Sequence, residues 1–157
     1  MSSKAKPMPN SRVNYVFFSD VQTRWEDNDI YGHINNAVYY SYFDSAVNAY
    51  LIERDALNIH EGDEIGLVVE SGCQYFSELA YPQKIDVGLR VGYLGNSSVR
   101  YELALFPLGS DVATAQGFFT HVYVDRKGRR PQKISGNLRR ALTDLLPVTT
   151  QQKSLKL

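Results

Sequence analysis

One long apolar stripe near the start of the chain constrains the fold more than any other feature. Its members fall at positions i, i+3, i+4, i+7, i+8, i+11 and i+12, and they are Tyr39, Tyr42, Phe43, Ala46, Val47, Tyr50 and Leu51. This spacing is typical of an α-helix that buries one face. Asn35 or Asn36 is a natural N-cap, and the charged residues 53–55 mark the end. The sequence therefore predicts one long helix with an apolar face that needs a partner.

The pattern changes to a period of two after residue 65. Apolar and polar side chains alternate over residues 84–93 and 99–106, and two further strand-like runs cover residues 67–76 and 112–124. Turn-like breaks at 81–83, 95–97 and 107–111 leave only short connections, which favour antiparallel pairing. With an earlier strand over residues 13–25, the order is strand, long helix and about four antiparallel strands. This order predicts a two-layer α+β domain whose open sheet edge is protected by dimerisation.

The chain is long enough for one domain with a real core. Residues 1–11 are polar and predicted to be disordered, residues 12–147 form the single domain, and residues 148–157 form a C-terminal tail. A short helix is expected after Ser135. Its apolar face would carry Leu138, Ala141, Leu142, Leu145 and Leu146.

Composition narrows the classes of function. The 17 Lys and Arg residues balance 17 Asp and Glu residues, and this zero net charge argues against nucleic acid as the main partner. No apolar run is long enough to span a membrane, and the N-terminus lacks the apolar core of a signal peptide. Cys73 is the only cysteine, so we expect a reducing, cytoplasmic setting. Three histidines without ligand spacing predict no metal site.

The loop between the first strand and the helix is where the chemistry-bearing residues gather. Residues 24–36 hold three carboxylates, a glycine, a histidine and three asparagines, two of them adjacent at 35 and 36. A carboxylate just before a helix N-terminus lies close to backbone N–H groups that have no partner within the helix. Asp29 would then be a base or a nucleophile beside an oxyanion site, which are the two parts that hydrolysis of an activated carbonyl needs. The alternative for Asp29 alone is a helix-capping carboxylate.

The same loop and helix carry a resemblance. They read R-W-x-D-x-D-x-x-G-H-x-N-N-x-x-Y-x-x-Y, in which the fixed positions are Arg24, Trp25, Asp27, Asp29, Gly32, His33, Asn35, Asn36, Tyr39 and Tyr42. A weaker match is Val124-Asp125-Arg126, followed by Arg130-Pro131. Together with the element order over residues 15–146, this pattern resembles the hotdog-fold thioesterases, in the branch of the 4-hydroxybenzoyl-CoA and acyl-ACP thioesterases.

The resemblance implies a fold and roles for particular residues. The fold would be α+β, an antiparallel sheet wrapped around one long central helix. Asp29 stands where the hydroxybenzoyl-CoA branch keeps its catalytic aspartate, and Asn36 stands where a backbone N–H polarises the thioester carbonyl. His33 matches the histidine of the acyl-ACP branch. Tyr31 occupies the place of that branch's asparagine, which makes Asp29 the stronger catalytic candidate.

Further residues are expected to bind the substrate. Tyr31, Gly32 and Asn35 lie in the loop beside the catalytic candidates. The basic turn offers Arg126 and Arg129 to the phosphates of coenzyme A or to the acidic surface of acyl carrier protein. Part of the aromatic stripe is expected to line an acyl pocket, with the rest in the core.

The prediction is a homodimeric or homotetrameric acyl-CoA thioesterase that needs no enzyme-bound cofactor, because a thioester is already activated. Two alternatives stay open: an acyl-ACP thioesterase, and a non-catalytic protein that binds acyl thioesters.

Overall fold

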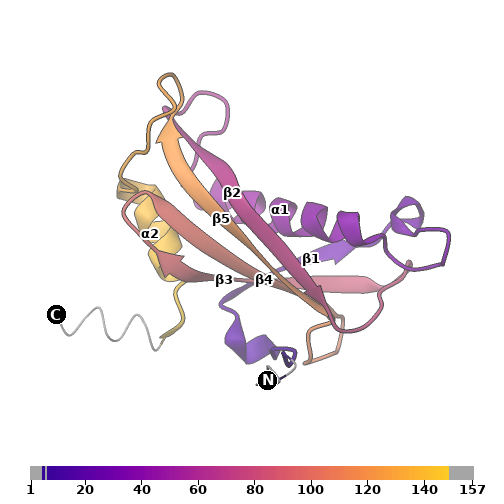
Figure 1. Cartoon of the computed structure of the whole chain (residues 1–157). Helices are drawn as coiled ribbons and strands as arrows, with labels where there is room; N and C mark the ends of the chain where they lie inside the picture. Colours follow the sequence, from indigo (N-terminus) through magenta and orange to yellow (C-terminus); the bar gives the residue numbers. More distant parts are fainter. Residues whose placement is uncertain (1–4, 6, 149–157) are drawn as a thin grey trace.

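A computed structural model describes residue 5 and residues 7–148 of the chain (Figure 1). The predicted tails at 1–11 and 148–157 therefore fall in part on residues outside this description. The described part of the N-terminal segment contacts the domain, since the Asn10 carbonyl accepts a hydrogen bond from the Ala113 N–H at 3.0 Å. Ser11 forms an isolated antiparallel bridge with Val112.

The described chain contains five strands and two α-helices. In chain order they are β1 (Phe17–Gln22), α1 (Asn36–Glu53), β2 (Glu64–Tyr75), β3 (Lys84–Leu94), β4 (Ser98–Pro107), β5 (Ala115–Asp125) and α2 (Gly136–Asp144). The strands form one antiparallel sheet in the order β1-β3-β4-β5-β2. β1 and β2 are thus the two edges, although they are the first two strands of the chain.

Helix α1 lies along the concave face of the sheet and buries the predicted stripe (Figure 1). All seven stripe residues are buried, and they share one apolar core with the inward-facing side chains of β3, β4 and β5. Gly117 on β5 brings the helix close, because a Cβ there would collide with the Phe43 ring. The predicted helix and its buried face are confirmed.

The expected first strand over residues 13–25 is wrong at both ends. Residues Arg12–Asn14 and Trp25–Asp27 form short 3₁₀ turns, and only Phe17–Gln22 pairs with β3. Local hydrogen bonds explain the difference: the Tyr15 N–H donates to the Arg12 carbonyl, and the Asp27 N–H donates to the Arg24 carbonyl. Strand propensity does not reveal these competing local bonds.

The last expected strand also begins later than predicted. β5 starts at Ala115 rather than at Val112, because Val112 and Ala113 pair with the N-terminal segment instead. The short helix predicted after Ser135 is confirmed as α2, with Leu138, Ala141 and Leu142 buried. It is held to α1 by the Tyr50 hydroxyl, which donates to the Ala141 carbonyl at 2.7 Å.

This arrangement of one long helix inside a curved antiparallel sheet is the hotdog fold, and the α+β prediction is confirmed. Among the described residues, no helix combines the length and apolar character needed to cross a membrane.

One buried polar side chain lies on β5, the strand next to the edge strand β2. His121 on β5 is 8 % exposed, and its Nε2 atom has no hydrogen-bond partner among the described residues. The rings of Tyr101, Phe119 and Tyr123 surround it, and Asp44 on α1 is the charged group that acts on it. Burial lowers the pKa of His121, and the Asp44 charge opposes that shift without cancelling it.

Stability should therefore fall in mild acid. An unfolded imidazole takes up a proton below about pH 6.5, whereas folded His121 resists protonation because its pKa is lowered. The unfolded state then binds more protons, so unfolding becomes easier as pH falls below that value. We expect the urea midpoint to drop between about pH 7.5 and about pH 5.5, and His121→Phe to reduce this drop. His60→Gln, at an exposed histidine, is the control, and an unchanged drop in His121→Phe would contradict the assignment.

Candidate active site

A buried carboxylate fixes the loop between β1 and α1. Asp27 is 2 % exposed, and its Oδ2 accepts hydrogen bonds from the Arg24 N–H at 2.8 Å and from the Tyr42 hydroxyl at 2.6 Å. Its backbone carbonyl accepts from the Asn35 N–H at 2.9 Å. A buried charge needs such partners. Asp27 thus joins the loop to α1. Its role is structural, and the neighbouring Arg24 is one of its partners.

Asp29 organises the tight turn that follows. Its Oδ1 accepts from the Tyr31 N–H at 2.8 Å and, at 3.4 Å, from the His33 N–H, while its own N–H donates to the His33 carbonyl at 2.7 Å. Gly32 has a φ of +83°, a backbone conformation that side chains disfavour. The half-buried Asp29 carboxylate is therefore held by backbone donors on one oxygen. Its Oδ2 has no hydrogen-bond partner among residues 7–148.

The start of α1 provides a donor that could stabilise negative charge. Asn35 is the N-cap, and its side-chain oxygen accepts from the Ala37 N–H at 3.0 Å. Asn36 is the first helical residue, and no acceptor for its N–H is found in the described part of the chain. The helix dipole adds partial positive charge at this end. The Asn36 N–H is thus a donor suited to an oxyanion.

A hollow of about 280 Å³ opens beside this donor. It is lined by two short segments, the helix entrance and the end of β2 with the residues after it: His33, Ile34, Asn36 and Tyr39, and Tyr75, Phe76, Ser77 and Glu78. The His33 Nε2 atom lies 2.9 Å from the Glu78 Oε2 atom. The Tyr75 hydroxyl donates to the Asn36 carbonyl at 3.2 Å, and the Tyr39 and Tyr75 rings meet edge to face. The hollow has an aromatic wall and polar groups at its mouth.

The pKa of the Tyr39 phenol is shifted by its surroundings in this hollow. Burial raises the pKa of Tyr39 to about 12, and the negative charges of Glu78 and Asp29 add to the shift. Tyr39 is therefore neutral at physiological pH. Asp29 lies in the adjoining loop and does not itself line the hollow.

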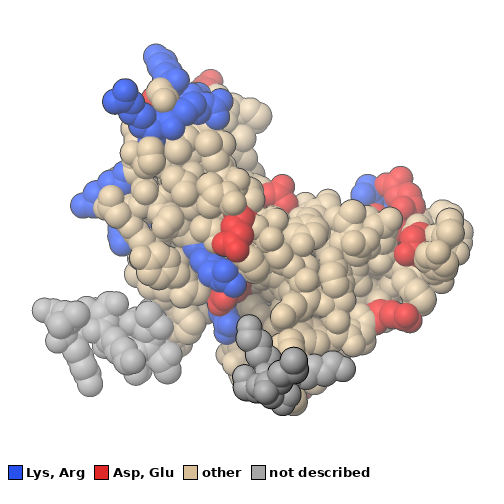
Figure 2. Space-filling model, in the orientation of Figure 1, with Lys and Arg blue, Asp and Glu red and all other residues tan. Residues whose placement is uncertain are grey.

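The structure brings together only some of the predicted site residues. Asp29, Tyr31, Gly32, His33, Asn35 and Asn36 lie in one loop, and His33 and Asn36 line the hollow. Arg126 lies elsewhere, and its guanidinium donates to the Ile59 and Gly62 carbonyls. The basic turn is at the far end of β2, where Glu64 pairs with Asp125, whereas Tyr75 pairs with Ala115. Figure 2 shows Lys and Arg gathered at that tip, and mainly Asp and Glu at the loop end.

Sequence reasoning missed Glu78 and Tyr75. Both follow from the path of β2, which runs antiparallel to β5 and returns beside the helix entrance. The Ile34 N–H then donates to the Leu79 carbonyl at 2.7 Å and holds the two segments together. No spacing in the sequence links residues 33 and 78. Across the described residues, no three His, Cys, Asp or Glu side chains gather in a way that could hold a metal ion.

The fold and this loop define a hotdog-fold thioesterase. Residues 23–142 match the family model of the Thioesterase-like superfamily, so the chain belongs to that superfamily.

Several known proteins are similar to this chain. A crystal structure of PA5185 from Pseudomonas aeruginosa is 56 % identical, with a TM-score of 0.86 over 89 % of this chain and 97 % of that one. Slr0204 from Synechocystis, a 1,4-dihydroxy-2-naphthoyl-CoA thioesterase, is 16 % identical, with a TM-score of 0.75 over 82 % of this chain and 96 % of that one; this likeness shows the fold. The uncharacterised protein YsmA from Bacillus subtilis is 20 % identical over 93 residues, which are 59 % of this chain and 63 % of YsmA. The chain thus spans less than two thirds of YsmA.

The Asp27 network yields a stability prediction. Tyr42→Phe removes one donor to a buried carboxylate, and we expect a loss of about 1–3 kcal/mol in the free energy of unfolding, because the acceptor is left partly unsatisfied. Urea denaturation measures the loss. Tyr40→Phe, on the neighbouring face of α1, is the matched control and should change stability little. Equal stability of Tyr42→Phe and wild type would show that the loop does not depend on this bond.

Proposed function

We propose that this protein hydrolyses an acyl-CoA thioester to a free carboxylic acid and coenzyme A. The observation that carries the proposal is Asn36 at the first turn of α1, which lines a hollow next to the Asp29 loop and whose N–H has no acceptor among the described residues. A thioester carbonyl in this hollow would direct its oxygen at that N–H. Negative charge that develops on the oxygen would then be stabilised by the donor and by the helix dipole.

Asp29 supplies the negative group for the attack, by one of two routes. As a base it would take a proton from a water molecule, whose oxygen adds to the carbonyl carbon. As a nucleophile its oxygen would add to the carbonyl and expel the thiolate, which leaves a mixed anhydride that water then cleaves. Both routes consume one water molecule and release an acid and a thiol. The Oδ2 atom is the one for this role, because Oδ1 is occupied by backbone donors.

His33 has a specific observation in its favour. Its Nε2 atom faces the Glu78 carboxylate at 2.9 Å inside the hollow, and an imidazole held by a carboxylate is a common arrangement for a base. We assign His33 a positioning role, because its backbone closes the Asp29 turn and Tyr31 occupies the place of the asparagine that would complete the histidine arrangement. The alternative is tested below.

The assembly we propose is a homodimer at least, formed by pairing the β2 edges. Leu67, Val68 and Val69 on this edge are 38, 52 and 61 % exposed, and an unpaired apolar edge favours association. Two-fold pairing of identical strands is antiparallel, so it would bring the partner's Glu64 end beside the Tyr75 end of this protomer. A homotetramer would add a second interface to this dimer.

This pairing gives the basic turn a role. Asp125 pairs with Glu64, so in the dimer the turn that carries Arg126 and Arg129 would lie near the hollow of the other subunit. Those cations could then meet the phosphates of coenzyme A.

The acidic loop end, with Glu26, Asp29 and Glu78, is less suited to an acidic carrier protein, which makes an acyl-ACP thioesterase the second candidate. Slr0204, with the same fold, is named for a CoA thioester. A reducing, cytoplasmic setting stays a prediction from the single cysteine.

Asp29→Asn should lower thioester turnover about a hundredfold or more, since it removes the base or nucleophile while it keeps the side chain's size. Thiol release from a panel of acyl-CoAs measures turnover, and circular dichroism checks folding. Near wild-type turnover in a folded variant would contradict the role of Asp29. The wild-type protein also separates an enzyme from a binding protein, because a binding protein would hydrolyse no acyl-CoA. In an enzyme, Asp29→Asn should lose hydrolysis and keep acyl-CoA binding.

His33→Ala should reduce activity only moderately, by loosening the loop. The pH profile of kcat/KM provides the second readout. An imidazole base would lose activity as pH falls through about 6.5, whereas a carboxylate, with an ordinary pKa of about 3.9, keeps it to lower pH. Complete loss in His33→Ala with substantial activity in Asp29→Asn would exchange the two roles.

Sedimentation should show a dimer or a larger assembly for the wild type. Val69→Lys places a charge on the β2 edge and should shift the protein toward monomer and lower its activity, because the partner's cations leave the site. Leu108→Lys, on an exposed turn away from β2, is the control. A fully active wild-type monomer would rule out the shared site.

A further inference from the structure

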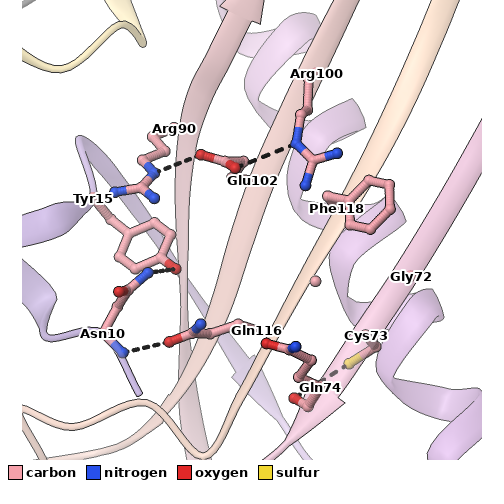
Figure 3. Close-up of a pocket in the computed structure, with 11 residues that line it drawn as sticks. Asn10, Tyr15, Gly72, Cys73, Gln74, Arg90, Arg100, Glu102, Gln116 and Phe118 are labelled. Carbon is pink, nitrogen blue, oxygen red and sulfur yellow. Dashed lines mark hydrogen bonds and ion pairs between the residues drawn. The ribbon is translucent and has the colours of Figure 1, made fainter. Parts of the chain in front are cut away.

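A second hollow, of about 210 Å³, lies on the face of the sheet that points away from α1 (Figure 3). Successive side chains of a strand point to opposite faces of the sheet, and this alternation decides which residues line the hollow. Gly117 faces the Phe43 ring of the helix, so its neighbours Gln116 and Phe118 point outward. Glu102 pairs with Phe118 and Arg90 pairs with Glu102, which places their side chains on the same outer face. Asn10 and Tyr15 of the N-terminal segment form the remaining wall.

Three glycines make room for this hollow's walls. A Cβ at Gly72 would lie 2.6 Å from the Phe118 ring, one at Gly88 would lie 2.9 Å from Tyr15, and one at Gly92 would lie 2.5 Å from the Glu102 carboxylate. Glycine weakens a strand interior and often marks a close approach. Here each glycine allows one lining side chain to lie flat on the sheet. The hollow is thus built into three positions of two strands rather than left by loose surface packing.

The charges at its upper rim are arranged around Glu102. The carboxylate faces the Arg90 Nε at 3.0 Å and the Arg100 Nε at 3.3 Å. Arg90 also donates through Nη1 to the Asn14 carbonyl at 2.9 Å. One carboxylate and two guanidinium groups leave an excess of one positive charge, and no other charged side chain of residues 7–148 lines the hollow.

Arg100 is the cation with free donors. Its guanidinium carbon lies 3.8 Å from the centroid of the Phe118 ring, and its Nε is engaged by Glu102. Within the described residues, its two terminal nitrogens have no partner. In Figure 3 one of them points down toward the side of the hollow that holds Gln116 and Gln74, and the other points to the side. A guanidinium held on its face and at Nε is oriented in advance, and its terminal nitrogens suit two-point contact with a planar anion.

Neutral amides lie on the other side. The Gln116 Oε1 atom accepts a hydrogen bond from the Asn10 N–H, so the Gln116 NH₂ group remains as a donor. The Gln74 amide lies next to it (Figure 3). Arg100 and Gln116 thus offer donors from two sides of the same hollow, which the Phe118 and Tyr15 rings also line.

We propose that this outer-face hollow binds a small organic monocarboxylate, through the terminal nitrogens of Arg100 and the amide of Gln116. The single excess charge matches one carboxylate better than a doubly charged phosphate. The aromatic walls favour a ligand with an apolar part over an inorganic ion. The site is separated from the Asn36 hollow by the sheet, so its occupancy does not depend on the proposed hydrolysis.

The test is a titration of the full chain with sodium benzoate, sodium acetate and inorganic phosphate at constant ionic strength, followed by backbone amide NMR. Saturable shifts are expected at Gly72, Gly117 and Phe118, with benzoate tighter than acetate and acetate tighter than phosphate. Shifts at Gly32 and His33 would report binding in the other hollow and are followed separately.

Two variants and a matched control complete the experiment. Arg100→Gln and Gln116→Glu should each weaken benzoate binding at the outer face about tenfold or more, because each removes a donor to the carboxylate. Gln116→Glu keeps the acceptor for Asn10. Arg54→Gln is the control, since Arg54 likewise packs on an aromatic ring and pairs with an acid, but lies at the C-cap of α1. Absence of saturable shifts at Gly72, Gly117 and Phe118, equal binding by all variants, or tighter binding of phosphate would overturn the proposal.

Discussion

The packing of α1 against the concave face of the sheet is the interaction on which the rest of this structure depends. The helix contributes its whole apolar stripe, and the sheet receives it where Gly117 leaves space for the Phe43 ring. Burial of aromatic side chains on this scale supplies much of the free energy that orders the domain. It also fixes the position of the helix N-terminus. That contact places the Asn36 N–H, and local hydrogen bonds of Asn35 and Asp29 then set the cap and the turn beside it.

The buried Asp27 carboxylate converts this packing into a defined loop. A charge without partners would be costly in the interior, so the loop must bring the Arg24 N–H and the Tyr42 hydroxyl to it. That requirement holds residues 24–27 against the middle of α1, and the remaining residues must turn tightly to reach the helix start. The turn centred on Asp29 and Gly32 follows. The proposed catalytic carboxylate is thus oriented by a neighbouring carboxylate that takes no part in the chemistry.

The two faces of the sheet carry different kinds of site. The inner face is apolar, and its hollow opens only where α1 begins, next to backbone donors. The outer face is hollowed by glycines and lined by charged and amide side chains. Strand alternation produces both from the same segments, because β4 places Leu103 in the core and Glu102 on the outside. A ligand on one face could influence the other only through the strands that separate them.

The sequence alone determined the helix, the strand order along the chain and the composition of the proposed catalytic loop. These features depend on short-range periodicity and on residues close together in the chain, so spacing is enough to predict them. It did not determine that β1 and β2 are both edges, that Glu78 faces His33, or that Arg126 lies far from Asp29 within one protomer. Those relations depend on which strands pair and in which register. Pairing is decided by burial of the whole core at once, and only the tertiary structure contains that information.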